Sequence, residues 1–286
     1  MRVLGSSMLC CLIGDPVEHS LSPQMHNAVF EHLGINAVYI PLRVPKDALA
    51  ASIEIIRKSN FLGANVTMPH KESVLALLDE VDGAASRIGA VNTIAKEGDK
   101  LVGYNTDGPA ALHAIASRVS KLSNKSALVF GAGGAAKAIA WLLVEHVAEL
   151  HIANRTFERA KELTRALSRR GAAYSHPLER GVLEQLLPKV DIVINATSVG
   201  MYPQVDETIL TREYFLPHHV VFDAVYNPLL TRFLQEAKKA GVRKIIPGIE
   251  MFVLQGALAF EKWTGRRAPI ELMRSVVEEE LGGGSV

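Results

Sequence analysis

The sequence contains little that a secreted, membrane-spanning or metal-binding protein would need. Only two of its 286 residues are cysteines, and they are the neighbours Cys10 and Cys11. Adjacent cysteines make a poor structural staple, so reduced and buried thiols in a cytoplasmic protein are the simplest interpretation. The stretch Met1–Cys11 is too short and too broken for a signal peptide. No cluster of histidine, cysteine and carboxylate residues has the spacing of metal ligands, so we expect no metal.

Charge of one sign and long apolar runs are scarce too. The formal net charge is +1, which gives no reason to expect binding to nucleic acid or to an anionic membrane. The most apolar region, residues 127–148, is interrupted by a glycine-rich turn, by Lys137 and by Glu145, so it is no membrane span. Internal repeats and low-complexity linkers are absent from the sequence as well. The length of 286 residues indicates two domains or one large one.

A β-α-β pattern occupies Ala127–Thr156. A short apolar run is followed by a turn with the spacing G-x-G-x-x-A and then by an apolar helix pattern. In such a turn Gly131 permits the sharp bend, Gly133 lets the backbone approach a pyrophosphate, and Ala136 lets the helix pack close to the strand. The helix N-terminus adds N–H groups for the phosphates. The pattern predicts a Rossmann-type, doubly wound domain that binds a dinucleotide.

The end of the second strand of this unit indicates which dinucleotide it is. An NAD-binding fold usually has an acidic residue there for the ribose 2′-hydroxyl, whereas this chain has Asn154-Arg155-Thr156 and then Arg159. A guanidinium attracts a 2′-phosphate and can bond it with two N–H groups. The sequence therefore favours NADP. The alternative is that the two arginines only form a solvated helix face.

Hydroxyl groups gather at the start of a helix near the N-terminus. Ser20 and Ser22 precede Pro23, and a serine followed by proline is a helix-start signal with the serine as N-cap. Ser22 could therefore be a cap and nothing more. Two hydroxyls at a helix N-terminus also suit a carboxylate. The pattern alone leaves both interpretations open.

Lys71 stands at an unusual place in the predicted structure. A helix is predicted to open at Met68-Pro69-His70-Lys71 and to continue through Val74, Leu75 and Leu78. A cation in the first turn faces the positive end of the helix dipole, which favours the neutral amine and suits a proton-transfer group. An exposed lysine would lose only a few tenths of a kcal/mol there, so a purely structural role stays open.

Polar side chains stand at the ends or centres of several predicted strands. The predicted strand Ile88–Ile94 has Asn92 near its centre, and Leu101–Tyr104 is its hairpin partner. Asp107 starts the next helix, where it could be an N-cap. Ligands of open α/β sheets bind beyond the carboxyl ends of strands, so the polar ends of the strands over 191–195 and 220–223 are predicted to face the nicotinamide half of the cofactor.

Together these stretches resemble the shikimate dehydrogenase family, from Gly14 to about Arg266. The resemblance rests on separate blocks in the family's order: Gly14–Val17, His19–Pro23 and His26-Asn27; Asn65–Thr67 with Pro69 and Lys71; Gly89–Thr93; Asn105–Asp107; Gly131–Ala135; Asn154–Thr156; Asn195–Met201; and Gln255-Gly256 with Trp263–Gly265. It implies an oxidoreductase that reversibly reduces 3-dehydroshikimate to shikimate with NADPH, on the route to aromatic amino acids.

The resemblance also implies roles for individual residues. Lys71 is the acid/base group, paired with Asp107. The substrate carboxylate and ring hydroxyls are held by Ser20, Ser22, Thr67, Asn92, Asp107 and Gln255, with Asn65 and Tyr226 lining the same pocket. The cofactor is held by Gly131, Ala132, Gly133, Gly134, Ala135, Asn154, Arg155, Thr156, Arg159, Ala224 and Gly248.

The predicted architecture is two α/β domains with a cleft between them. Residues 1–106, completed by C-terminal helices over 246–286, form the substrate domain, and 107–245 form the NADP-binding domain. The partner is a small-molecule substrate. The sequence leaves the assembly state open, a homodimer included.

Three alternatives compete with this interpretation. One is a quinate-preferring member of the family that uses NAD, against which Arg155 and the two serines argue. Another is a glutamyl-tRNA reductase, which would need a nucleophilic cysteine. The last is a non-catalytic NADPH-binding regulator, which would be expected to have lost Lys71 or Asp107.

Overall fold

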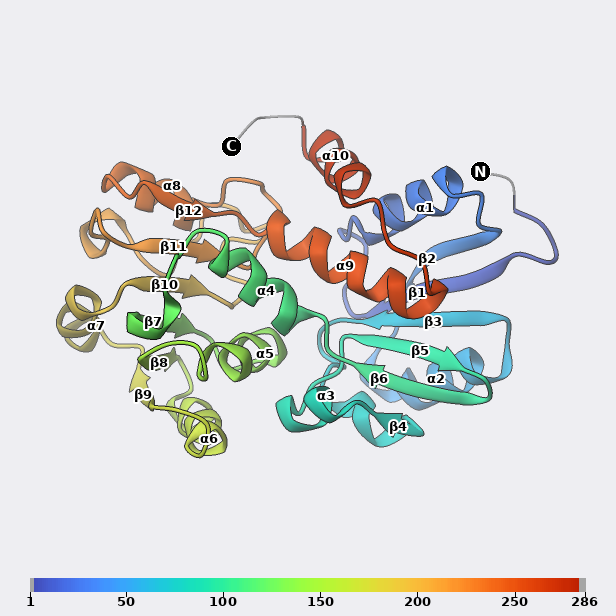
Figure 1. Ribbon diagram of the computed structural model, residues 1–286, viewed down its shortest axis with the longest axis horizontal. Coiled ribbons are helices and arrows are strands. Elements are labelled where there is room, and N and C mark those ends of the chain that lie inside the picture. Colours follow the sequence, from blue (N-terminus) through green and yellow to red (C-terminus); the bar gives the residue numbers. More distant parts are fainter. Residues whose placement is uncertain (1–2, 283–286) are drawn as a thin grey trace. The chain divides into compact units, whose positions relative to one another are not determined.

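The computed structural model describes residues 3–282, which form two compact α/β units (Figure 1). The described residues of Met1–Thr106 and Val253–Gly283 make up the first unit, and Asp107–Phe252 make up the second. The α/β class with a Rossmann-type half, predicted from the sequence, is confirmed. The predicted domain limits, after residues 106 and 245, stay a prediction. Within residues 3–282, no helix is long and apolar enough to cross a membrane.

The first unit is built on a mixed six-stranded sheet in the order β2-β1-β3-β5-β6-β4. Strand β1 pairs in parallel with β2 and β3, whereas β5 pairs antiparallel with β3 and β6. Its elements up to Tyr104 are β1 (Met8–Gly14), α1 (Ser22–His32), β2 (Ala37–Arg43), the 3-10 helix η1 (Lys46–Ala48), α2 (Leu49–Lys58), β3 (Phe61–Val66), the 3-10 helix η2 (Ser73–Leu77), β4 (Glu80–Val81), α3 (Gly83–Ile88), β5 (Thr93–Glu97) and β6 (Lys100–Tyr104).

This unit is completed by α9 (Ile249–Thr264), from Val253 onward, and by α10 (Ile270–Glu280). Helix α10, drawn in red, packs on α1, drawn in blue (Figure 1). On α9, Phe260 contacts Phe30 with ring centroids 5.7 Å apart, and Trp263 Nε1 donates to the carbonyl of Ile94 at 2.9 Å. A Cβ at Gly63 would come within 2.1 Å of that same carbonyl oxygen, so glycine is required where α9 meets the sheet.

The thiols of the first unit are core groups. Cys10 and Cys11 are free cysteines on β1 and are fully buried, as predicted. Burial raises the pKa of the Cys11 thiol to about 12 and also raises that of Cys10. Because the thiolate is the reactive form, neither cysteine is suited to act as a nucleophile.

The second unit has a parallel six-stranded sheet in the order β12-β11-β10-β7-β8-β9. The chain leaves β7 toward one edge and returns to the other side of it at β10, which makes the carboxyl end of β7 a topological switch point. The elements are α4 (Asp107–Ala116), the 3-10 helix η3 (Leu122–Asn124), β7 (Ser126–Phe130), α5 (Gly134–Leu143), β8 (Glu149–Asn154), α6 (Phe157–Leu167), β9 (Ala173–Pro177), α7 (Arg180–Leu186), the 3-10 helices η4 (Leu187–Lys189) and η5 (Arg212–Tyr214), β10 (Ile192–Asn195), β11 (Val220–Asp223), α8 (Arg232–Lys239) and β12 (Lys244–Ile246).

Two predicted elements of the first unit are wrong. The segment around Lys71 is not an α-helix: residues 68–72 form turns, and the 3-10 helix η2 follows. The carbonyl of Lys71 accepts the N–H of Val91 at 2.8 Å, so a tertiary contact takes a bond that an α-helix would need. The predicted strand Ile88–Ile94 is also wrong at its start, because Ile88 ends α3, Gly89 is left-handed, and β5 begins at Thr93.

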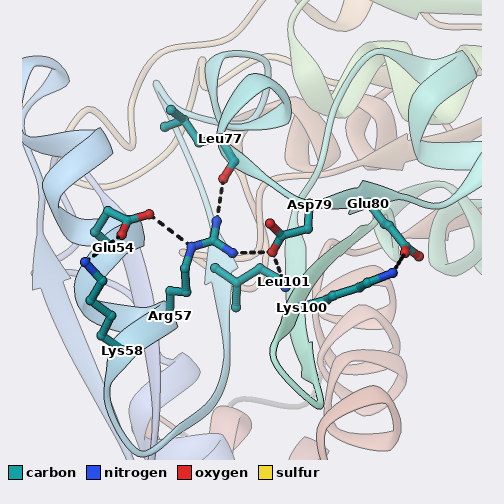
Figure 2. Close-up of polar contacts among 8 residues, drawn as sticks. All are labelled: Glu54, Arg57, Lys58, Leu77, Asp79, Glu80, Lys100 and Leu101. Carbon is teal, nitrogen blue, oxygen red and sulfur yellow. Dashed lines mark hydrogen bonds and ion pairs between the residues drawn. The ribbon is translucent and has the colours of Figure 1, made fainter.

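A cluster of charged groups fixes the segment that follows Lys71 (Figure 2). Arg57 on α2 donates from Nε to Glu54 Oε1 at 3.0 Å and from Nη2 to the carbonyl of Leu77 at 3.0 Å. Its Nη1 donates to Asp79, whose Oδ2 also accepts the N–H of Leu101 on β6 at 2.7 Å. The end of η2 is thereby tied to both α2 and β6.

Candidate active site

The two N-terminal serines lie together at the start of α1. Ser20 Oγ accepts the N–H of Ser22 and donates to Ser22 Oγ, both at 3.2 Å. The helix begins at Ser22 itself, and no side chain caps it. The interpretation of Ser22 as an N-cap is therefore wrong, and both hydroxyls stand at the helix end where an anion is favoured.

A buried amide network joins β2, β3, the start of β5 and the segment after β6. Tyr39 O–H donates to Asn65 Oδ1 at 2.8 Å, and Asn65 Nδ2 donates to the carbonyl of Asn92 and to Thr93 Oγ1, both at 3.2 Å. Asn92 Oδ1 accepts the N–H of Thr106 at 2.7 Å. Both amide hydrogens of Asn65 are thus engaged inside the protein, which suits a residue that fixes the neighbouring backbone.

Gln255 reaches this network from the far end of the sequence. It lies on α9, and its Oε1 accepts Asn92 Nδ2 at 3.5 Å. The next residue, Gly256, packs closely on α1, since a Cβ there would lie 2.3 Å from Met25 Cε and would force that side chain to move. The structure therefore brings together three of the predicted substrate-binding residues, Asn65, Asn92 and Gln255.

Lys71 lies on a segment held by backbone contacts on both sides. The carbonyl of Met68 accepts the N–H of Asp15 at 2.9 Å, and the carbonyl of Lys71 accepts that of Val91, the neighbour of Asn92. The buried ring of His70 donates from Nε2 to the carbonyl of Val44 at 2.6 Å. The backbone that carries Lys71 is thus fixed by the sheet and its loops, and the helix-dipole argument made for it does not apply.

Thr67 lies where β3 ends, beside the end of β1. Its N–H donates to the carbonyl of Ile13 at 2.9 Å. A Cβ at Gly14 would lie 2.3 Å from Thr67 Cγ2, so the glycine of β1 makes space for this threonine.

His26 is a buried polar residue whose environment the sequence does not indicate. It is fully buried on α1, stacks on Tyr39 at 4.6 Å and contacts Trp263 at 5.1 Å. Neither ring nitrogen has a hydrogen-bond partner, and burial lowers the pKa of His26 to about 3. In the sequence His26 stands in one of the blocks that carry the resemblance and on a helix, but neither signal indicates these contacts.

In the second unit, the glycine-rich turn has the geometry that a phosphate needs. Gly131 has φ +113°, a conformation that favours glycine, and its N–H donates to the carbonyl of Ala153 at 2.9 Å. Gly133 is extended, and α5 starts at Gly134 with its N–H groups available for a ligand. A Cβ at Gly133 would meet no atom within 4 Å, so the turn has an open face there. Ala132 is buried in the turn.

The predicted 2′-phosphate residues follow β8. Asn154 Nδ2 donates to the carbonyl of Thr156 at 2.8 Å and closes a turn. Arg155 and Thr156 are exposed in this turn, and Arg159 is exposed in the first turn of α6. Because Arg155 precedes α6, it does not belong to a helix face. The alternative that the two arginines only form a solvated helix face therefore does not apply to Arg155.

The ends of β10 and β11 hold a side-chain network that the sequence does not reveal. Asn195 and Asp223 are paired across the two strands, and both have 0% exposure. Asn195 Nδ2 donates to Asp223 Oδ1 at 2.9 Å. The prediction that the polar strand ends face the cofactor is therefore wrong for these two side chains, which point at each other.

The other predicted residues of this unit lie around the end of β11. Ala224 and Tyr226 follow the strand, and the Tyr226 ring stacks on Phe252 with centroids 3.8 Å apart. A Cβ at Gly248 would lie 2.3 Å from the carbonyl oxygen of Val225, so only glycine fits where the two loops meet. Asp107 is buried as the first residue of α4.

Three family patterns match the chain in sequence order. The substrate-binding domain of shikimate dehydrogenase matches residues 12–94, the shikimate/quinate 5-dehydrogenase family matches 113–213, and the C-terminal domain of shikimate 5′-dehydrogenase matches 248–278.

Individual proteins match over nearly their whole length. A shikimate dehydrogenase (NADP⁺) of Moorella thermoacetica is 45% identical over 288 residues, which cover 100% of this chain and 97% of the relative. A solved shikimate dehydrogenase in complex with NADP⁺ superposes with a TM-score of 0.90 at 39% identity, over 98% of each chain. The Thermus thermophilus enzyme, solved with NADP(H) and shikimate, gives 0.84 at 38% identity over 95% of this chain and 99% of its own.

Proposed function

This chain belongs to the shikimate dehydrogenase family, and we propose that it catalyses the reversible, NADPH-dependent reduction of 3-dehydroshikimate to shikimate. The observation that carries the proposal is the presence, in one chain, of an open phosphate-binding turn followed by Arg155 and of a buried amide network that includes Gln255. The similar proteins bind NADP and shikimate by name, which supports the assignment.

NADP fits the second unit because backbone atoms, and no side chain at Gly133, line the open face of the glycine-rich turn. The open face at Gly133 and the start of α5 would take the pyrophosphate, and Arg155 with Arg159 would take the 2′-phosphate. The backbone of Ala224 and Gly248 would lie against the nicotinamide half. When bound, NADPH supplies a hydride for the ring carbonyl carbon of the substrate.

The substrate fits the first unit as an anionic, hydroxyl-rich ring. We assign its carboxylate to Ser20 and Ser22 and its hydroxyls to Thr67, Asn92 and Gln255. Asn65, which the resemblance places in the same pocket, donates to the carbonyl of Asn92 and so fixes the backbone of that residue. Tyr226 and Asp107, from the second unit, stay predicted contacts.

Lys71 is the proposed proton donor. Reduction places negative charge on the carbonyl oxygen, and the ammonium of Lys71 gives one proton to that oxygen, which becomes the shikimate hydroxyl. In the reverse direction the neutral amine takes the proton back. Its predicted pairing with Asp107 remains a prediction, as do a homodimer and a cytoplasmic location.

Two rivals have less support. A thiol nucleophile of the glutamyl-tRNA reductase kind is unsuited to Cys10 and Cys11, which are buried with raised pKa values. A quinate enzyme that uses NAD would gain nothing from Arg155 beside the ribose.

The test is oxidation of shikimate by the purified protein, followed through NADPH absorbance, for the wild type, Lys71→Ala and the control Lys121→Ala, which changes another lysine that is exposed. NAD and quinate are run in parallel. We expect NADP-linked turnover that falls roughly 10²–10⁴-fold in Lys71→Ala alone, since this is the usual contribution of general acid catalysis. A wild type that binds NADPH but turns over neither substrate would identify the regulator, and activity only with quinate and NAD would refute the specificity.

A further inference from the structure

Asp223 connects three structural elements of the second unit through its two oxygens. Oδ1 accepts Asn195 Nδ2 at 2.9 Å and the N–H of Val225 at 2.9 Å, and Oδ2 accepts the hydroxyl of Thr231 at 2.6 Å. Thr231 is the N-cap of α8, where its hydroxyl also accepts the N–H of Leu234. One carboxyl group therefore joins the ends of β10 and β11 to the start of α8.

Asn195 links Asp223 to the loop after β10. Its Oδ1 accepts both the N–H of Thr197 at 3.0 Å and the hydroxyl of Thr197 at 2.7 Å, and its Nδ2 reaches the carbonyl of Val199 at 3.2 Å. The side chain that donates to Asp223 is thus the one that folds this loop.

The other arm of the network fixes the loop after β11. The bond from the N–H of Val225 to Asp223 makes a tight turn through Ala224. The carbonyl of Val225 then lies against Gly248, at a distance that admits no side chain. A shift of the Asp223 carboxyl would move Val225 and, with it, the backbone assigned to the nicotinamide half of the cofactor.

Burying a carboxyl group costs free energy, so Asp223 is not an ordinary core residue. Asp223 is fully buried, and an unpaired carboxylate in such a place is strongly disfavoured. Three donors converge on it instead, from a side-chain amide, a backbone N–H and a hydroxyl. Full burial also means that Asp223 cannot touch a ligand, so any influence on the reaction must act through the residues it binds.

We propose that Asp223 is a positioning residue that sets the turn at Ala224–Tyr226 and thereby orients the nicotinamide half of NADP(H) for hydride transfer. The inference rests on the proposed function, because it assigns this turn to the reacting end of the cofactor. The network does approach the glycine-rich turn, where a Cβ at Gly131 would lie 3.1 Å from Thr197 Cγ2. Arg155 follows β8, which β7 separates from β10 in the sheet, so binding of the 2′-phosphate is expected to be unaffected.

The experiment compares Asp223→Ala, Asp223→Asn, Thr231→Val and Thr231→Ser. Each variant is assayed for kcat of shikimate oxidation and for the dissociation constants of NADPH and of 2′,5′-ADP, a fragment that contains the 2′-phosphate but no nicotinamide. We expect kcat to fall at least tenfold in Asp223→Ala and several-fold in Thr231→Val, with 2′,5′-ADP binding within twofold of the wild type. Asp223→Asn, which keeps the shape and Oδ1, and Thr231→Ser, which keeps the hydroxyl, should restore most of kcat.

Two results would overturn the proposal. One is wild-type kcat in both Asp223→Ala and Thr231→Val. The other is an equal loss of kcat and of 2′,5′-ADP affinity, which would mean that the network only stabilises the fold. Should Asp223→Ala not fold, Thr231→Val with its serine control decides alone. If the proposed function fails, the wild type is inactive from the start; the inference is then decided by whether Asp223→Ala weakens NADPH binding more than 2′,5′-ADP binding.

Discussion

Because Asp223 is buried, we expect the stability of the protein to fall as pH rises toward neutral. Burial raises its pKa from the ordinary 3.8 to about 7, and the hydrogen bonds from Thr231, Val225 and Asn195 oppose this shift without cancelling it. The folded state thus binds the proton more tightly than the unfolded state. Between these two pKa values the unfolded chain has already lost its proton while the folded one keeps it, so stability falls as pH rises through this window.

The size of the effect follows from the shift. One pKa unit corresponds to about 1.4 kcal/mol, so ionisation of Asp223 lowers the free energy of unfolding by roughly 4 kcal/mol in all. This loss is absent below the unfolded pKa and nearly complete above about pH 7. Asp223→Asn cannot titrate. From pH 5 to pH 7, the free energy of unfolding of the wild type should fall by about 2 kcal/mol relative to this variant.

The two tryptophans allow this to be measured for the second unit by itself. Trp141 lies on α5 and Trp263 on α9, within the first unit. In a Trp263→Phe background, fluorescence during urea unfolding reports Trp141 only. Wild type and Asp223→Asn are compared at pH 5, 6, 7 and 8, and His219, whose pKa burial lowers to about 4, cancels in the difference. Parallel curves would refute the reasoning, because they would mean that the three hydrogen bonds outweigh the burial.

Three further predictions concern the cofactor turn and the first unit. Gly133→Ala should leave the melting temperature unchanged, since the added Cβ meets no atom, but weaken NADPH binding about tenfold or more in a titration; unchanged affinity would place the pyrophosphate elsewhere. Arg155→Asp should shift the ratio of kcat/KM for NADP over NAD by about 100-fold toward NAD, and an unaltered ratio would leave Arg155 no part in selection. Arg57→Met should lower the free energy of unfolding by about 1–2 kcal/mol in urea while kcat stays within twofold, because Arg57 bonds the Leu77 carbonyl and Asp79 but touches no proposed substrate ligand; a large loss of kcat would instead show that this cluster positions Lys71.

The cofactor half of the fold was predictable because its signals are local. The spacing from Gly131 to Ala136 requires a strand before it and a helix after it, and a turn with φ +113° needs glycine. Such features depend on neighbouring residues alone, so the sequence is sufficient to recognise them.

The segment around Lys71 could not be predicted in this way. Its apolar spacing through Val74 and Leu78 is helical, yet the carbonyl of Lys71 binds Val91 and the ring of His70 binds Val44. These partners come from other strands and loops, and no local pattern indicates them.

The same limit applies to the buried polar groups. Asn65 and Asn92 are conspicuous in the sequence, but that Asn65 serves the backbone of Asn92 follows from strand register. Asp223 and Thr231 form a network only because β11 and α8 are brought together, and the burial of His26 depends on Trp263 from the end of the chain.

The contacts of α9 with α1 have a consequence for how the newly made chain folds on the ribosome. Met25, His26 and Phe30 are synthesised early, but their partners Gly256, Trp263 and Phe260 emerge near the end of translation. Among the described residues the second unit, by contrast, is the continuous stretch Asp107–Phe252, and it can fold while most of α9 is still being made. We therefore expect the nascent protein to acquire its nucleotide-binding half first, with the apolar surface of α1 exposed to chaperones or to aggregation until α9 is made.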